Sequence, residues 1–185
     1  MTGSWPSIKS VVISGGTGFV GAAIAREFAE RHRNCVITIL DLHPPGPDHI
    51  VPDTAHFIEV DITDLDGVTT ALQQTGPDVV VHTAGIVPVL TERCGRRLEK
   101  HVWRVNVDGT RNMLEATKKS GSRTFIYTST CCVLTDYFGM PLPNANEEWP
   151  TPRTSLIYGE SKMCALCLYL WHTFLELLTV LRIDF

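Results

Sequence analysis

Short runs of apolar, mostly β-branched residues alternate along the chain with longer segments in which apolar residues recur every three or four positions. Such runs are typical of strands buried on both faces, and such segments are typical of helices with one buried face. The expected strands cover residues 11–14, 35–41, 56–60, 79–82, 124–128 and 178–182. This alternation predicts repeated strand–helix–strand units and therefore a parallel sheet.

Each expected helix carries one apolar stripe that would pack on the sheet. The stripes consist of Val20, Ile24 and Phe28, then of Leu65, Val68 and Leu72, and in a longer third helix of Leu98, Val102, Val105 and Met113. We therefore predict an α/β fold of the Rossmann type, a doubly wound parallel sheet with helices on both faces, formed by one domain over residues 1–185. A loop rich in proline at 139–153 precedes the last helix. It either borders the active site or is a surface excursion.

Three glycines form a GxxGxxG pattern between the first expected strand and the first expected helix. Without side chains there, the backbone can turn tightly and approach a pyrophosphate at the helix N-terminus. We expect this loop to bind the phosphates of a dinucleotide; the alternative is a tight turn that binds no ligand. The loop residues assigned to the cofactor are Gly15, Thr17, Gly18, Phe19, Val20 and Gly21.

Asp41 ends the second expected strand, 20 residues after Gly21. At this spacing an acidic side chain can accept hydrogen bonds from the hydroxyls of the adenosine ribose. The carboxylate would repel the 2′-phosphate of NADP, and no arginine or lysine directly follows Asp41. The sequence therefore favours NAD over NADP as the cofactor.

Two further segments that follow expected strands are assigned to the same cofactor. Asp61 and Ile62 come after the third strand, where a carboxylate and an apolar neighbour could hold the adenine ring. Alternatively, Asp61 or Asp64 caps the next helix. Small residues close the fourth strand and would let the backbone pass close to the dinucleotide. The residues assigned here are His82, Ala84 and Gly85.

Tyr158 and Lys162 lie four residues apart in the segment LIYGESK, so they share one face of the last expected helix. A tyrosine exchanges protons near neutral pH only when a cation lowers its pKa, and a lysine one turn away can supply that charge. Such a pair also arises by chance, as a packed ring beside a solvated ammonium. The glycine loop and the upstream hydroxyl of Thr130 favour the catalytic interpretation.

These segments together resemble the extended short-chain dehydrogenase/reductase family, most closely its branch of 3β-hydroxysteroid dehydrogenases and decarboxylating sterol-4-carboxylate 3-dehydrogenases. The motifs that carry the resemblance are SGGTGFVG at 14–21, VDITD at 60–64, VVHTAG at 80–85, VNVDGTRNMLEA at 105–116, FIYTST at 125–130 and YGESK at 158–162. The resemblance implies an NAD-dependent oxidation of a 3β-hydroxyl on a sterol-like substrate. Family members continue into a C-terminal portion that builds most of the substrate pocket, so we expect that portion to be missing after the sixth strand.

The resemblance also implies a role for individual residues. Tyr158 would be the general acid/base, Lys162 would hold the nicotinamide ribose, and Thr130 would hydrogen-bond the reacting oxygen. Thr130 rather than Ser129 aligns with the catalytic serine of the family, which leaves Ser129 one residue behind, near the nicotinamide. Asn106 would support the dinucleotide or a water relay; the alternative is an amide that is satisfied within its own helix.

Other functions stay open at this point. A nucleotide-sugar epimerase or a dihydroflavonol-like reductase would use the same scaffold with the same Tyr158 and Lys162. A non-catalytic dinucleotide-binding protein would bind NAD without turnover of any alcohol.

Composition and charge indicate which kinds of partner the chain would bind, but they do not identify its substrate. The chain has 185 residues, of which 44% are hydrophobic, and a formal net charge of −4 with no basic stripe, which argues against nucleic-acid binding. The six cysteines are scattered among apolar segments, which indicates reduced thiols. Cys164 and Cys167 form a CxxC, but they lie in an apolar helix with no second ligand pair at zinc spacing, so no metal is expected. The polar N-terminus predicts a cytoplasmic protein, with the cytosolic face of the endoplasmic reticulum as one site. The apolar segment 163–178 is expected to contact a membrane surface or a second copy of the chain.

Overall fold

The computed structural model describes residues 7–48, 50–92, 94–134, 144, 146, 154–174 and 179–183. Within these ranges, six parallel strands form one sheet in the order β3-β2-β1-β4-β5-β6. The strands are β1 (Ser10–Ser14), β2 (Val36–Asp41), β3 (His56–Glu59), β4 (Val79–His82), β5 (Thr124–Thr128) and β6 (Thr179–Ile183). The predicted Rossmann-type sheet is confirmed, with strand bounds that agree to within one residue. The predicted start of the sixth strand, Leu178, lies outside the described residues.

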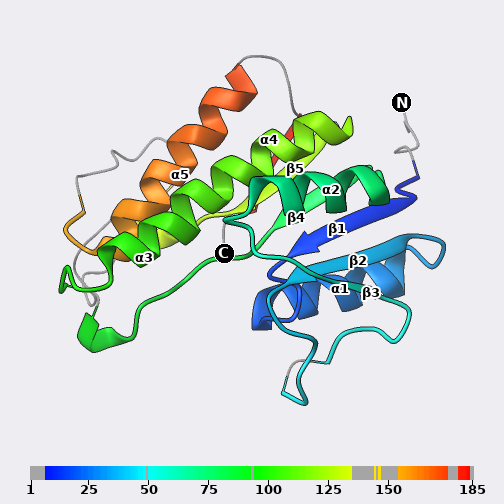
Figure 1. Ribbon diagram of the computed structural model, residues 1–185, viewed down its shortest axis with the longest axis horizontal. Helices are drawn as coiled ribbons and strands as arrows, with labels where there is room; N and C mark the ends of the chain where they lie inside the picture. The colour runs from blue at the N-terminus through cyan, green and yellow to red at the C-terminus, as the bar shows by residue number, and fades with distance from the viewer. Residues whose placement is uncertain are drawn as a thin grey trace.

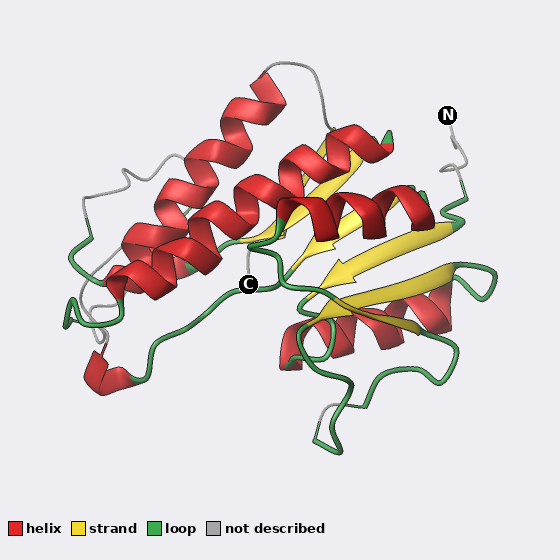
Figure 2. Cartoon of the chain, viewed as in Figure 1, coloured by secondary structure: helices red, strands yellow, loops and turns green. Residues whose placement is uncertain are grey.

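The central strands read as continuous apolar runs because helices cover both of their faces. On one face, Val12, Leu40 and Val80 belong to a core shared with helices α2 (Leu65–Thr75), α4 (Thr110–Ser120) and α5 (Ile157–Phe174). On the other face, Ile13 and Ile37 pack with helix α1 (Phe19–Arg31). Figure 1 shows α2, α4 and α5 side by side on one face of the sheet, with α1 on the opposite face. The layers of helix and sheet are also clear in Figure 2.

The apolar stripe predicted for α1 is right for Ile24 and Phe28 but wrong for Val20. Ile24 and Phe28 pack against the core, whereas Val20 is 37% exposed. Gly21, Ala22 and Ala25 are the buried residues of this helix, because their small size lets α1 approach the sheet closely. The first turn of α1 therefore lies beyond the sheet edge, where Val20 lines a cavity.

The third predicted helix is one helical segment over residues 99–120 with a wider stretch inside it. Helix α3 (Glu99–Trp103) continues through the π-helical stretch η2 (Arg104–Gly109) into α4. Such stretches are rare and occur frequently at functional sites. Here the stretch contains the buried side chain of Asn106.

The remaining described elements are short. They are the single turns η1 (Leu90–Glu92) and η3 (Cys131–Val133), which lie in the connections after β4 and β5. The predicted loop at 139–153 lies outside the described residues except for Asn144 and Asn146.

Candidate cofactor and catalytic site

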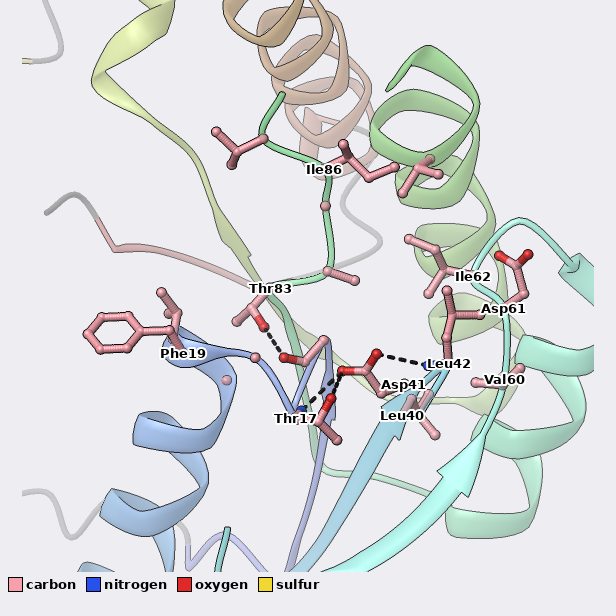
Figure 3. A pocket seen from close by; sticks show the side chains of 18 of the residues that line it. Thr17, Phe19, Leu40, Asp41, Leu42, Val60, Asp61, Ile62, Thr83 and Ile86 are labelled. Atoms are coloured by element: carbon pink, nitrogen blue, oxygen red, sulfur yellow. Dashed lines mark hydrogen bonds between the residues drawn. The ribbon is translucent and has the colours of Figure 1, made fainter. Parts of the chain in front are cut away.

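A cavity of about 530 Å³ opens at the carboxyl ends of β1, β2 and β4. Strand β1 pairs with β2 on one side and β4 on the other, so the strand order reverses at this point. Ligands of open α/β sheets bind at such a reversal, beyond the carboxyl ends of the strands. Figure 3 shows the glycine loop on one side of the cavity and the segments that follow β2, β3 and β4 around it.

The glycine loop is pressed against the segment that follows β4. Gly15 has a φ of +70°, and a Cβ added there would lie 2.6 Å from the backbone nitrogen of Ala84. A Cβ on Gly21 would collide with the carbonyl oxygen of Gly15. Helix α1 begins directly after Gly18, which has no side chain to cap the first turn. The N–H groups of that turn are therefore directed out of the helix end that borders the cavity, which fits a pyrophosphate.

Asp41 holds the glycine loop at the cavity wall. Its Oδ2 accepts hydrogen bonds from the backbone nitrogen of Thr17 (3.1 Å) and from Thr17 Oγ1 (2.6 Å), and its Oδ1 accepts from the nitrogen of Leu42 (2.8 Å). The carboxylate lines the cavity, as the ribose assignment requires. Sequence reasoning found the acid but not its link to Thr17.

The segment after β3 separates the two roles that the sequence left open. Asp64 is the N-cap of α2, because its carboxylate accepts from the nitrogens of Asp66 and Gly67. Asp61 does not cap the helix: its Oδ1 accepts from the nitrogen of Thr63 (2.8 Å), and its side chain is exposed at the cavity. Ile62 lines the same cavity while most of its surface is buried. This agrees with their assignment to the adenine end.

The His82 side chain does not lie at the cavity, and the prediction that it contacts the cofactor needs correction on this point. The ring is 1% exposed and is hydrogen-bonded through Nδ1 to Ser14 Oγ (2.6 Å) and through Nε2 to Thr110 Oγ1 (3.0 Å). Thr110 donates its hydroxyl hydrogen to the Asn106 carbonyl (2.6 Å), so its oxygen accepts from Nε2 and Nδ1 accepts from Ser14. Burial, together with the charge of Lys162, lowers the pKa of His82 to about 3. His82 is thus a neutral side chain that joins Ser14 of β1 to Thr110 of α4 through hydrogen bonds. Ala84 and Gly85 line the cavity, whereas His82 does not.

Asn106 is not satisfied within its own helix, so the alternative considered for it is wrong. Its Oδ1 accepts from the nitrogen of Ile86 (2.8 Å), and its Nδ2 donates to the Ile86 carbonyl (3.0 Å). Nδ2 also donates to Ser161 Oγ (3.0 Å), whose hydroxyl in turn donates to the Tyr158 carbonyl (2.8 Å). Asn106 therefore joins the segment that lines the cavity to the first turns of α5.

Contacts around the start of α5 bring the three proposed catalytic residues onto adjoining segments. The Lys162 side chain is buried, and its Nζ donates to the carbonyl of Thr128 (2.6 Å), the last residue of β5. A Cβ on Gly159 would collide with the Cys132 carbonyl, so the first turn of α5 is packed tightly on the η3 turn that Thr130 caps. Thr130, Tyr158 and Lys162 lie outside the lining of the 530 Å³ cavity.

The hydroxyls near this start of α5 are suited to hold a ligand. Thr130 Oγ1 accepts from the nitrogen of Cys132 (3.2 Å), which leaves its hydrogen to donate. Ser129 Oγ is buried and makes no hydrogen bond to any part of the chain that the structure describes. A buried hydroxyl of this kind normally has a partner, which a bound ligand would supply.

The buried Lys162 should make the free energy of unfolding depend on pH. Burial lowers its pKa from 10.5 to about 7. Between these values the unfolded chain binds the proton more tightly than the folded chain, so the free energy of unfolding rises with pH. We expect wild-type stability to increase, relative to Lys162→Met, from about pH 7 to about pH 9. Urea unfolding of both proteins across this window measures the effect, and a difference that is constant with pH would contradict it.

Several cavity-lining residues were not found from the sequence. They are Leu42, Val60, Ile86, Val87, His101 and Val105, besides Leu40 near the end of β2. His101 and Val105 are four residues apart, so a common helix face could have been inferred. Ile86 and Val87 continue the segment after β4, where no local pattern distinguishes a lining residue from an ordinary loop residue.

No group of three histidine, cysteine or acidic side chains suited to a metal occurs in the described ranges. Of the helices whose residues are described, none has the length and apolar character needed to cross a membrane. In α5, Tyr169 is buried while Cys167 and Leu170 are exposed, and association through this helix stays a prediction.

Fold, strand-order reversal and glycine loop together define a dinucleotide-binding Rossmann protein. The chain belongs to the NAD dependent epimerase/dehydratase family, whose model matches residues 11–173. The broad resemblance seen in the sequence is thereby confirmed, and NAD is the cofactor of this family.

The curated relatives of the chain include sterol and steroid dehydrogenases. It is 31% identical over 166 residues to the decarboxylating sterol-4-alpha-carboxylate 3-dehydrogenase of Candida albicans, covering 86% of this chain and 45% of that protein. It is 34% identical over 144 residues to human 3 beta-hydroxysteroid dehydrogenase type 7, covering 75% of this chain and 37% of that protein. The chain thus spans less than half the length of these curated relatives.

Among solved structures, the chain resembles the complex of UDP-glucose 4-epimerase from Thermus thermophilus with NAD. The TM-score is 0.75 at 28% identity, over 94% of this chain and 53% of that chain. The bound NAD of that structure agrees with the cofactor inferred from the cavity.

Proposed function

We propose that the chain is the cofactor-binding part of an NAD-dependent oxidoreductase that oxidises the 3β-hydroxyl of a sterol-like substrate. The observation that carries the proposal is the setting of Lys162. Its buried ammonium donates a hydrogen bond to the carbonyl of Thr128 at the end of β5. Lys162 lies one helical turn after Tyr158, and Thr128 lies two residues before Thr130 in the chain. A cation and two hydroxyls on adjoining segments are the groups that proton transfer to and from an alcohol requires.

The residues described above fit the cofactor. Asp41 would accept the adenosine ribose hydroxyls, and the glycine loop with the N-terminus of α1 would hold the pyrophosphate. Ser129 and Lys162 would hold the nicotinamide end, where the buried Ser129 hydroxyl gains a partner. When bound, NAD supplies the acceptor for a hydride.

Side chains of the protein would accept the proton of the substrate hydroxyl. The alcohol carbon loses its hydrogen together with the C–H electron pair, and the hydroxyl proton passes to Tyr158 Oη as the C–O bond becomes a carbonyl. Thr130 donates a hydrogen bond to the reacting oxygen and fixes its position. The positive form of Lys162 stabilises the phenolate of Tyr158 before the transfer. The pKa of Lys162, about 7, lets this lysine exchange its own proton near neutral pH.

Sequence similarity supports a sterol-like substrate. The curated relatives named above are sterol or steroid dehydrogenases.

The test is a substrate panel with NAD in excess, followed by the absorbance of NADH. A 4α-carboxysterol and a 3β-hydroxysteroid without the carboxyl group are compared with UDP-glucose. We expect NADH from the first two, with release of carbon dioxide only from the carboxysterol, because a 3-ketone activates the adjacent carboxylate for loss. Epimerisation of UDP-glucose without net NADH would overturn the proposal and assign the epimerase alternative.

A further inference from the structure

The carboxylate of Asp41 is held by three donors before any ligand binds. Two of them belong to Thr17, whose backbone N–H and Oγ1 both reach Oδ2, and the third is the Leu42 N–H on Oδ1. Figure 3 shows the dashed contacts that join Asp41 to Thr17 on one side and to Leu42 on the other. A carboxylate has about four acceptor positions, so these donors occupy most of them and fix one orientation of the side chain.

This orientation matters because Thr17 and Asp41 lie on different elements. Thr17 belongs to the glycine loop before α1, and Asp41 ends β2, 24 residues later. The Thr17 hydroxyl is the shortest of the three contacts at 2.6 Å. This bond joins a charged side chain on the sheet to the loop that would hold the pyrophosphate.

We propose that Thr17 is a specificity-determining residue, which selects NAD over NADP by holding the Asp41 carboxylate in the cavity wall. A carboxylate free to rotate could turn away from the 2′-phosphate of NADP and lower the repulsion. The carboxylate held by Thr17 keeps its charge at the cavity, and it presents its remaining acceptor position to a ribose hydroxyl. Because the Thr17 hydroxyl can rotate about its C–O bond, a ribose hydroxyl can share Oδ2 with it.

A purely structural role for Thr17 makes a different prediction. If its hydroxyl only stabilises the glycine loop, its removal weakens NAD and NADP by the same factor, since both bring the same pyrophosphate to that loop. If it orients Asp41, its removal changes the ratio of the two affinities. The ratio therefore separates the two roles.

The experiment is calorimetric titration of the wild type and its variants with NAD and, separately, with NADP. Thr17→Val keeps the β-branched shape and the backbone N–H but loses the hydroxyl, and Thr17→Ser is the matched control that keeps it. We expect Thr17→Val to weaken NAD by roughly tenfold with little change for NADP, because the lost bond is to a charged group. Thr17→Ser should stay within about twofold of wild type for both cofactors.

A double-mutant cycle with Asp41→Ala completes the test. Without the carboxylate, Thr17→Val should have no further effect on the ratio of NAD to NADP affinity. An unchanged ratio in Thr17→Val, or an additive effect in the double variant, would overturn the role of Thr17. The inference rests on the proposed function only through the cofactor: a wild-type chain that binds neither dinucleotide would overturn both, whereas wild-type binding with an unchanged ratio would overturn this inference alone.

Discussion

Replacement of Tyr158 by phenylalanine should lower turnover of a 3β-hydroxysterol by about 10²- to 10⁴-fold, the usual contribution of a positioned general acid or base. The variant loses only the hydroxyl that takes the substrate proton. Residue 158 stays on α5 one turn before Lys162, and the hydrogen bond from Ser161 to the residue-158 carbonyl does not involve the side chain. NAD affinity should therefore stay within about twofold of wild type, since the lost interaction acts in the transition state.

The measurement is initial-rate kinetics with NAD, together with calorimetric titration of the cofactor. Tyr169→Phe is the matched control, because Tyr169 lies on the same helix but packs in the core against Phe125 and Tyr127. The control should turn over at a rate close to wild type. Retained turnover in Tyr158→Phe would show that Tyr158 is not the general acid or base.

Replacement of Gly15 by alanine should abolish NAD binding and lower the free energy of unfolding by about 2–4 kcal/mol. Two effects add at this position. The φ of +70° is unfavourable for any residue with a Cβ, and that Cβ would lie 2.6 Å from the Ala84 nitrogen. Relief of the collision requires the glycine loop to move away from the segment after β4, which opens the wall that would hold the pyrophosphate.

Gly121→Ala separates the two effects. Gly121 follows α4 with a φ of +80°, and a Cβ there has no heavy atom within 4 Å. This variant should lose only the conformational part, about 1–2 kcal/mol, and bind NAD as wild type does. Urea unfolding and calorimetry of both variants give the comparison. Equal stability losses and equal NAD affinities would show that the contact between Gly15 and Ala84 is unimportant.

The features predicted well from the sequence are those that depend on neighbours in the chain. Strand bounds followed from short apolar runs and agree with the observed strands to within one residue. The glycine loop and Asp41 were found because their spacing reflects a backbone conformation and a strand length. These are properties of one strand–helix–strand unit, so a local pattern contains them.

The features that were missed depend on residues far apart in the chain. Thr17 reaches Asp41 across 24 positions, Ser14 reaches His82 across 68, and Asn106 reaches Ser161 across 55. No periodicity encodes such hydrogen bonds, because they arise only when the sheet is assembled. His82 illustrates the consequence: its position at the end of β4 suggested the cofactor, whereas the direction of its side chain depends on which face of the sheet it occupies.

The central place of β1 in the sheet determines when the protein can fold on the ribosome. Ser14 pairs with His82, so β1 lacks one neighbour until 68 more residues have been synthesised after it. At ordinary rates of translation this takes roughly 3–14 s, during which one apolar edge of β1 is open to pairing with other chains. The order of the strands therefore leaves this edge exposed to association with other chains during biosynthesis.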